Sequence, residues 1–310
     1  MQILVTGGAG FIGSHVVDAY IDAGHSVVVV DDLSTGRREN VNPKAHFFHI
    51  DIRSNELASI FEMYPIEIIN HHAAQMDVRK SVADPQFDAS INIVGMLNLM
   101  ENAVRSRVKK VIFASTGGAI YGEQDYFPAD EDHATRPLSP YGIAKLATEK
   151  YLYYYKEVHG LSSVILRYAN IYGPRQNPHG EAGVVAIFSD KLLRDEQPMI
   201  NGDGHQTRDY VFIGDVVKAN VLALTVQNSE IFNIGTGIET DVNTLYASIQ
   251  VALGTHKPEV HTQAKKGEQL RSVISSKKIE RLLGWKPSVT IDDGLVTTVE
   301  FFRSRKPPQK

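Results

Sequence analysis

A tyrosine and a lysine four residues apart in this sequence could form a proton-transfer pair. The segment SPYGIAKLATEKYL places Tyr141 and Lys145 at the start of a predicted helix, where residues four apart lie on one face. An ammonium about 5 Å from a phenol, at an effective dielectric of roughly 20, favours the phenolate by roughly 3 kcal/mol. That shift would suit a general base working near neutral pH. A surface pair on an ordinary amphipathic helix is the competing interpretation.

A glycine-rich turn could bind the pyrophosphate of a dinucleotide. TGGAGFIG, residues 6–13, spaces Gly8, Gly10 and Gly13 as G-x-G-x-x-G, and Gly7 adds a G-x-x-G-x-x-G reading. The turn follows one predicted strand and opens one predicted helix, so backbone amides and the positive end of the helix would face an anion. Because the context is the one this motif requires, the turn predicts a dinucleotide site.

Three acidic residues follow the next two predicted strands. Asp31 ends the second strand, where a carboxylate can accept hydrogen bonds from the adenosine ribose and would repel a 2'-phosphate, which favours NAD over NADP. For Asp32 a turn cap is an equally good interpretation. Asp51 follows the third strand and is predicted to face the adenine edge, with a capping role as the alternative.

The elements that must position these residues alternate along the first half of the chain. Short runs rich in Val and Ile are predicted strands, at 3–6, 26–30, 45–50, 67–70, 110–114 and 163–167. Helices are predicted between them, at 11–23, 54–63, 87–105 and 141–159. Right-handed crossovers then give an α/β fold, a doubly wound parallel sheet of the Rossmann type.

The alternation stops after Arg167, which predicts a second, smaller unit. Further helices are predicted near 242–253, 276–283 and 292–303, with short strands between them. We expect a dinucleotide-binding domain and a smaller mixed α/β substrate domain. The first covers 1–170, and the later segment of about 208–234 is expected to return to it. The second covers 171–207 and 235–310.

Composition limits the function classes. The chain has 310 residues, 43% of them hydrophobic, and a formal net charge of −4, so nothing general favours nucleic-acid binding. It has no cysteine, which excludes a disulfide framework and a thiolate nucleophile. Neither a leader pattern nor a membrane span is recognisable, and we expect a cytoplasmic protein with a small-molecule partner and no membrane or nucleic-acid partner.

Several motifs together resemble one family, the extended short-chain dehydrogenase/reductases. In order they are TGGAGFIG, HHAAQ (71–75), ASTGGAIYG (114–122), Tyr141-x-x-x-Lys145, LRYANIYGPR (166–175) and RDYVFIGDV (208–216). Within that family the chain is most similar to the UDP-glucose 4-epimerases, from Met1 to about Phe302. The order and number of the motifs make the resemblance to the family specific. They are less specific for the sugar that the protein would act on.

The resemblance implies bound NAD and a UDP-sugar held between the two domains. Tyr141 would remove the proton of the sugar 4-hydroxyl while hydride passes to NAD, and the 4-keto sugar would turn over before hydride returns. Lys145 would hold the nicotinamide ribose and keep Tyr141 acidic. The cofactor positions implied are Gly7, Gly10, Phe11, Ile12, Gly13, Asp31, Asp32, Asp51, Ile52, Ala73, Ala74, Asn92, Tyr141 and Lys145.

Matching positions also imply a substrate groove. Asn170 and Arg208 would hold the diphosphate, Val184 would pack along the nucleotide, and Asn201 would lie near the uracil. Lys265 and Glu268 stand where similar proteins use Arg and Asp, and a lysine cannot reproduce an arginine fork. Ser272 stands where a bulky tyrosine tends to exclude N-acetylated sugars, so UDP-N-acetylglucosamine is an expected additional substrate.

One departure falls on a catalytic position. The family usually has a Ser or Thr four residues before the tyrosine of the YG pair, and here that position is Gly117. Ser115 and Thr116 lie just upstream, and alternate strand residues face opposite ways, so one hydroxyl at most is expected to reach the sugar. Thr116 is favoured because the glycines after it let the backbone bend, and Gly117 itself becomes a substrate contact.

Other reactions remain as alternatives. Related dehydratases place an acidic residue before the YG pair, and residues 117–120 here carry no ionisable group. A UDP-glucuronate 4-epimerase, another NAD-dependent nucleotide-sugar enzyme and a non-catalytic NAD-binding regulator stay open as alternatives.

His71 and His72 are expected to pack beside the cofactor rather than bind a metal. A homodimer is expected through helices 91–105 and 141–159.

Overall fold

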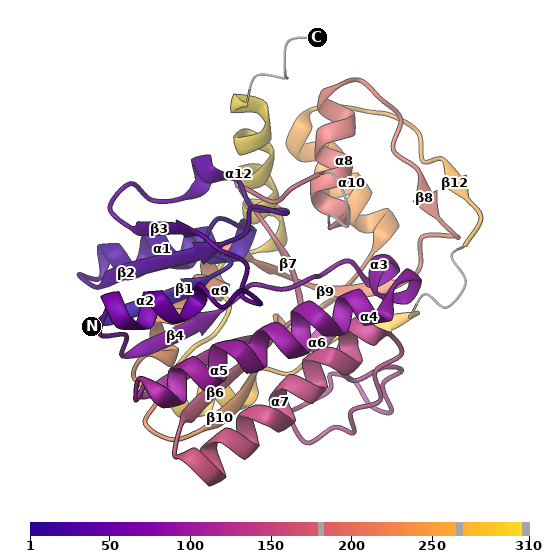
Figure 1. The fold of residues 1–310 in the computed structure, drawn as a ribbon. Helices are drawn as coiled ribbons and strands as arrows, with labels where there is room; N and C mark the ends of the chain where they lie inside the picture. The colour runs from indigo at the N-terminus through magenta and orange to yellow at the C-terminus, as the bar shows by residue number, and fades with distance from the viewer. Residues whose placement is uncertain (179–182, 265–268, 306–310) are drawn as a thin grey trace.

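A seven-stranded parallel sheet forms the centre of the computed structural model, which describes residues 1–178, 183–264 and 269–305 (Figure 1). The strand order is β10-β6-β5-β4-β1-β2-β3. Strands β2 and β3 are added on one side of β1 and the later strands on its other side, as in a doubly wound sheet. The strands are β1 Gln2–Thr6, β2 Ser26–Asp31, β3 His46–His49, β4 Ile68–His71, β5 Lys110–Thr116, β6 Ser162–Tyr168 and β10 Glu230–Ile234.

Helices cover both faces of this sheet. On one face α1 (Phe11–Asp22) and α9 (Ile213–Ala223) pack over Ile3 and Val5, and on the other α2 (Leu57–Met63), α5 (Met96–Arg105) and α7 (Pro140–His159) pack over Leu4. Alternate residues of one strand therefore enter two separate cores, which explains the continuous apolar runs that predicted the strands.

The predicted helix at 87–105 is interrupted. The chain forms α3 (Val78–Ala83) and α4 (Pro85–Ala89), passes through a π-helical turn at Ser90–Gly95, and continues as α5. Gly95 lies against Ile52, where a Cβ would come within 2.8 Å of the Ile52 Cδ1. The strand β10 and the helix α9 were not predicted as elements, although both lie in the segment of about 208–234 that was expected to belong to the first domain.

The smaller part has short sheets and its own core. A four-stranded sheet contains β7 (Asn170–Tyr172), β9 (Thr207–Phe212), β11 (Glu239–Asp241) and β13 (Arg271–Ser272), with β9 paired to the other three. The strands β8 (Ile200–Asn201) and β12 (His261–Thr262) pair separately. Figure 1 shows α8, α10 and α12 gathered beside them. These helices are Val184–Leu193, Val242–Leu253 and Ile291–Ser304.

The remaining short helices are α6 (Gly117–Ile120), α11 (Lys277–Leu283) and a 3-10 turn at Arg38–Asn40. In the part of the chain that the structure describes, every helix is too short or too polar to cross a bilayer.

Candidate active site

The glycine-rich turn brings the backbone of β1 close to the segment after β4. Gly7 has φ +70, and a Cβ there would lie 2.6 Å from the amide nitrogen of Ala73. A Cβ on Gly13 would collide with the carbonyl oxygen of Gly7. Gly10 starts α1 without any side-chain cap, so the amides of Phe11 and Ile12 open the helix toward the site. The turn fits a pyrophosphate at a helix N-terminus.

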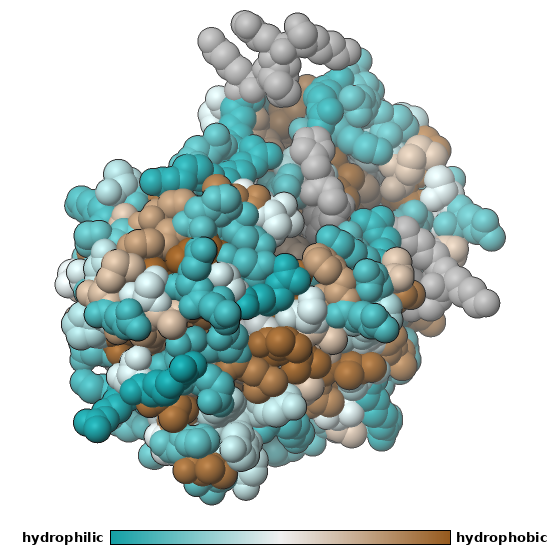
Figure 2. All heavy atoms as spheres, in the orientation of Figure 1, coloured by the Kyte–Doolittle hydropathy of each residue, from teal (hydrophilic) through white to brown (hydrophobic). Residues whose placement is uncertain are grey.

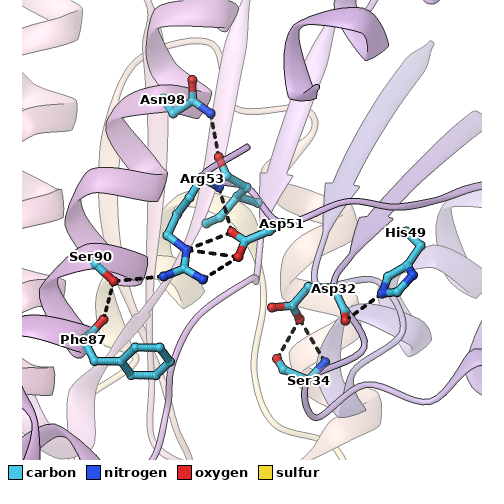
Figure 3. Close-up of polar contacts among 9 residues, drawn as sticks. Asp32, Ser34, His49, Asp51, Arg53, Phe87, Ser90 and Asn98 are labelled. Carbon is cyan, nitrogen blue, oxygen red and sulfur yellow. Dashed lines mark hydrogen bonds and ion pairs between the residues drawn. The ribbon is translucent and has the colours of Figure 1, made fainter. Parts of the chain in front are cut away.

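Asp31 and Asp32 have different roles. Asp31 is buried and accepts hydrogen bonds from the amides of Ala9 (2.9 Å) and Leu33 (2.8 Å), so it joins the glycine-rich turn to the end of β2. Burial raises the pKa of Asp31, and the two amide bonds oppose this shift. Asp32 instead caps its own turn through the amide (3.0 Å) and hydroxyl (2.6 Å) of Ser34 (Figure 3). Of the two carboxylates, Asp31 is thus the one that contacts the glycine-rich turn.

The arginines after β2 are engaged away from Asp31. Arg37 lies 3.6 Å from Glu39, and Arg38 stacks 4.4 Å over the ring of Phe47. A Cβ on Gly36 would come within 2.8 Å of Asp31 Oδ1, so the loop passes close over the carboxylate. This arrangement favours a ribose with two hydroxyls, as the sequence predicted.

Asp51, which is predicted to face the adenine edge, is held by an arginine. Arg53 donates from Nε to both carboxylate oxygens at 3.0 Å, and its Nη1 donates to Ser90 Oγ at 3.1 Å (Figure 3). Those hydrogen bonds lower the pKa of Asp51. The carbonyl of Ile52 accepts from Asn98 Nδ2 at 2.7 Å. Asp51 is therefore an ionised acceptor with a fixed orientation, which fits the exocyclic amine of adenine.

The segment after β4 is tied down by Asn92. Its Oδ1 accepts from the amide of Gln75 at 2.9 Å, and its Nδ2 donates to the Gln75 carbonyl and to Asp88 Oδ1. These bonds use both hydrogens of the Asn92 amide and fix the loop that carries Ala73 and Ala74. A cofactor contact by Asn92 stays a prediction.

Tyr141 and Lys145 lie on the first turns of α7. Ser139 caps this helix by accepting from the amide of Gly142 at 3.1 Å, and Pro140 occupies its first position. Lys145 Nζ donates to the carbonyl of Ala114 at 2.9 Å and lies 5.8 Å from the centroid of the Tyr141 ring. Burial lowers the pKa of Lys145 to about 8, and nearby carboxylates oppose the shift. The ammonium is close enough to favour a phenolate.

The two hydroxyls at the end of β5 point to different places. Ser115 is buried, and its hydroxyl donates to Glu149 Oε1 at 2.6 Å. Thr116 is only partly buried, and a Cβ on Gly118 would lie 3.9 Å from its Oγ1 and 3.3 Å from Asn170 Oδ1. Thr116 Oγ1 and Asn170 Oδ1 thus lie near the same glycine, whereas the hydroxyl proton of Ser115 is already donated to Glu149.

Gly117 has a steric explanation. A Cβ there would come within 2.6 Å of Ile274 Cδ1 and 3.3 Å of the Tyr168 carbonyl oxygen. Ile274 is fully buried and thus occupies the space that a Ser or Thr side chain would need. A glycine at position 117 fits this packing.

The small sheet collects several of the substrate positions. Asn170 on β7 pairs with Tyr210 of β9, and two residues earlier Arg208 of β9 pairs with Ser272 of β13. Val184 begins α8, and Asn201 ends β8. Arg208 donates from Nη1 to the carbonyl of Thr207 at 2.8 Å. The predicted positions Lys265 and Glu268 lie outside the described residues.

Sequence reasoning missed a buried polar network below the site. Arg167 pairs with Glu149 through two hydrogen bonds, of 3.0 and 2.6 Å, and donates to the Tyr121 hydroxyl at 3.0 Å. Tyr121 in turn donates to Asn233 Oδ1 at 2.6 Å. An arginine inside the apolar strand SVILRY was the available signal, because a buried arginine requires a partner.

The two histidines after β4 are neutral packing groups. The His71 ring lies 2.7 Å from Thr6 Oγ1 and stacks on Phe113, while His72 stacks on Tyr168. Burial and the charge of Lys145 lower the pKa of each to about 3. Within the described ranges no three His, Cys, Asp or Glu side chains cluster as metal ligands would.

Comparisons with known proteins agree with this geometry. A family model described as the NAD dependent epimerase/dehydratase family matches residues 3–235. A putative UDP-glucose 4-epimerase of Methanocaldococcus jannaschii is 46% identical over 303 residues, 98% of this chain and 99% of that protein.

Two solved structures are similar over nearly the whole chain. A UDP-glucose 4-epimerase of Thermotoga maritima, solved with UDP-glucose, has a TM-score of 0.96 and 49% identity. A UDP-glucose 4-epimerase of Thermus thermophilus, solved with NAD, has a TM-score of 0.93 and 43% identity. Each alignment covers 98% of this chain and 99% of the other. The predicted fold class, family and NAD cofactor are confirmed, and the chain belongs to the NAD dependent epimerase/dehydratase family.

Proposed function

We propose that this protein is an NAD-dependent UDP-glucose 4-epimerase, which interconverts UDP-glucose and UDP-galactose. The observation that carries the proposal is the Tyr141–Lys145 pair on α7, with Lys145 buried and bonded to the end of β5. NAD, when bound, supplies reversible hydride acceptance at C4 of the sugar. Tyr141 removes the proton of the 4-hydroxyl and later returns it, so no net oxidation results.

The other residues act on that proton transfer. Lys145 keeps its positive charge beside the phenol and favours the phenolate. Thr116 is the hydroxyl positioned to donate a hydrogen bond to the reacting sugar oxygen, which stabilises the charge that develops there. Ser115 holds Glu149 and takes no direct part.

The segment 117–120 carries no acid, which favours epimerisation over elimination. Dehydration requires an additional acid and base near the sugar, and the residues between Thr116 and Tyr121 are Gly117, Gly118, Ala119 and Ile120. A non-catalytic regulator would have no need of a tyrosine and a buried lysine in this geometry. Both arguments support a reaction that needs only one base and a returning hydride.

We propose that the substrate lies between two parts of the chain. Residues 1–170 with about 208–234 would bind NAD, and 171–207 with 235–310 would bind the UDP moiety. The pairing of β10 with β6 and the packing of α9 against α1 support this division. Asn170 and Arg208 would hold the diphosphate, and Val184 and Asn201 would contact the nucleoside. Lys265 and Glu268 remain proposed contacts on sequence grounds.

An N-acetylated substrate is a second candidate. Ser272 is small and buried beside Arg208 in the register of β13 with β9. A short side chain leaves more volume than a tyrosine at this position would. We propose that UDP-N-acetylglucosamine is epimerised in addition, and an assay with UDP-N-acetylgalactosamine that yields no product would contradict it.

We also propose a homodimer formed through α5 and α7. Figure 2 shows a hydrophobic patch over these helices. Ile143, Tyr151, Tyr154 and Val158 are exposed large side chains within about a quarter of the circumference of α7, and Val94 is exposed on the neighbouring π-helical turn. A contiguous apolar surface of this kind on a monomer favours association. Light scattering should give the mass of a dimer, and Tyr154→Glu should shift it toward the monomer.

One product assay tests the proposed function. Purified protein would be incubated separately with UDP-galactose, UDP-N-acetylgalactosamine and UDP-galacturonate, without added reductant, and the nucleotide sugars would be separated by chromatography. We expect conversion of UDP-galactose to UDP-glucose. Turnover restricted to the galacturonate would favour a UDP-glucuronate 4-epimerase, and bound NAD without any turnover would favour a regulator.

A further inference from the structure

Four charged side chains are buried close together, and one of them is the lysine of the catalytic pair. Lys145, Glu149 and Arg167 are each 4% exposed, and Asp88 is 1% exposed. A buried charge is costly unless another charge or several hydrogen bonds compensate it. Which charge compensates which therefore decides whether Lys145 stays an ammonium.

Glu149 and Arg167 compensate each other. Arg167 donates from Nε to Glu149 Oε1 at 3.0 Å and from Nη2 to Oε2 at 2.6 Å, a bidentate geometry. Ser115 adds a third hydrogen bond to the same carboxylate. This pair is neutral as a unit, although Glu149 lies one turn from Lys145 on α7 and is the obvious candidate for its partner.

Asp88 and Lys145 are the two charges that remain. Asp88 Oδ1 accepts from Gln75 Nε2 at 2.9 Å and from Asn92 Nδ2 at 3.0 Å, and both donors are neutral amides. Lys145 donates to a neutral carbonyl, that of Ala114. Asp88 is on α4, which packs directly against α7, and Thr148 of α7 donates to the Asn92 carbonyl at 3.1 Å. These contacts fix the position of the Asp88 carboxylate relative to α7.

We propose that Asp88 is a positioning residue for the reaction: it supplies the buried negative charge that holds Lys145 as an ammonium beside Tyr141. The proposal rests on the proposed function only through the role of Tyr141 as base. Gln75 and Asn92 hold Asp88 by hydrogen bonds that favour its ionised form. Gln75, the last residue of the HHAAQ motif, thus acts on the catalytic lysine indirectly, because it holds Asp88 on the helix that packs against α7.

The electrostatics agree with this placement. Burial is the largest cause that lowers the pKa of Lys145 to about 8, and Asp88 and then Glu149 oppose it. Burial also raises the pKa of Asp88 above its ordinary value, and the hydrogen bonds from Gln75 and Asn92, followed by the charge of Lys145, oppose this shift.

Apart from Asp88 and Glu149, the titratable groups of the described residues that pack around α7 are neutral, carry the same sign as Lys145 or have other partners. His71 and His72 at the end of β4 are neutral, since the pKa of each is about 3. Arg79 and Lys80 of α3 carry the same sign as Lys145, and Lys80 stacks 4.4 Å over the Phe87 ring. The charged groups on the other elements that pack against α7 are Glu101 and Arg105 of α5, Lys110 of β5 and Arg167 of β6, and Glu101 accepts from the hydroxyl of Tyr155.

Asp88→Asn tests the charge alone. Both hydrogen bonds end on Oδ1, so an asparagine oxygen can keep them while the charge disappears. Asp84→Asn is the matched control on the same helix, because its exposed Oδ1 accepts from the amide of Phe87 at 3.0 Å and an asparagine keeps that cap.

The first readout is the pH profile of turnover in enzyme saturated with NAD and UDP-galactose. Loss of the Asp88 charge lets Lys145 lose its proton at lower pH, so the alkaline limb should move down by about one unit while the acid limb stays. Asp84→Asn should leave both limbs in place. An unchanged alkaline limb in Asp88→Asn, or a shift confined to the acid limb, would overturn the proposal.

The second readout is independent of epimerase activity. In a thermal double-mutant cycle on the NAD-saturated protein, Asp88→Asn should lower the melting temperature of the parent but raise it, or leave it unchanged, in a Lys145→Met background, where Asp88 has no counter-charge. The same sign in both backgrounds, or failure of both Asp88→Asn proteins to fold, would show a packing role and contradict the proposal. A protein without epimerase activity that still shows the sign change would contradict the proposed function alone.

Discussion

The hydroxyl of Ser115 donates a 2.6 Å hydrogen bond to Glu149, and this bond distinguishes it from the neighbouring hydroxyl of Thr116, which the sequence favours for catalysis. Glu149 also accepts two hydrogen bonds from Arg167, so Ser115 is bonded to a buried ion pair. Thr116 follows it at the end of β5 and faces the space shared with Asn170.

We therefore expect Thr116→Val to slow epimerisation much more than Ser115→Ala. Loss of one hydrogen bond to the reacting oxygen should raise the barrier by about 1 to 3 kcal/mol, or slow turnover roughly 5-fold to 150-fold. Ser115→Ala should instead lower the unfolding free energy by about 1 kcal/mol with turnover within roughly twofold. Steady-state rates with denaturant unfolding measure both, and the reverse pattern would assign the catalytic hydroxyl to Ser115.

Gly117→Ser should destabilise the protein, and Ile274→Val should relieve part of that cost. The new Cβ would meet Ile274 Cδ1, the atom that valine lacks. Ile→Val alone costs about 0.5 to 1.5 kcal/mol, so the double variant should be more stable than the sum of the two single effects by about 1 kcal/mol or more. Additive effects in denaturant unfolding would mean that Ile274 does not exclude a side chain at 117.

Asp31→Asn should weaken NAD binding about 10-fold to 100-fold. An amide has one acceptor oxygen in place of two, so Ala9 or Leu33 loses a partner, and the ribose loses a charged acceptor. Asp32→Asn is the control, because an asparagine oxygen can still accept from Ser34. Calorimetric titration with NAD and NADP measures this. Equal losses in the two variants would be inconsistent with the assignment of Asp31.

The stability of the protein should fall steeply in mild acid because of His71 and His72. Each has a pKa of about 3 in the folded state, below the ordinary value of 6.5, so the unfolded chain binds more protons between these values. Stability from these groups is present above pH 6.5 and is lost as pH falls, by about 4 kcal/mol for the pair at pH 5.

A phenylalanine at position 72 keeps an aromatic ring beside Tyr168 and removes one of the two groups. His72→Phe should therefore reduce the loss of unfolding free energy between pH 7 and 5 by about 2 kcal/mol. The exposed His205→Gln serves as the control and should not change it. If the slope is the same in both variants, the buried histidines do not cause the acid sensitivity.

The first half of the fold could be predicted because its signals are local. The run SVVVV and the glycine-rich turn each specify structure within a few residues, and the Tyr141–Lys145 spacing places two side chains on one face. β10 was missed because its partner β6 is about 65 residues away, and the π-helical turn at Ser90–Gly95 has no comparable pattern.

The chemistry around the pair was harder to predict than the pair itself. Asp88 and Glu149 look like ordinary polar positions on two helices, and only the packing of α4 against α7 shows that both are buried beside Lys145. Likewise the intramolecular partners of Asp32 and Asn92 are set by the local turn of Ser34 and by the loop at Gln75, and their residue types alone do not indicate these partners.

The most direct test of the central claim is the rate at which purified protein converts UDP-galactose to UDP-glucose without added reductant, compared between the parent and Tyr141→Phe. The account predicts measurable conversion by the parent and a loss of at least about 100-fold in the variant, because the general base is removed while the ring remains. An inactive parent that nonetheless carries NAD, or a variant that keeps the parent's rate, would contradict it.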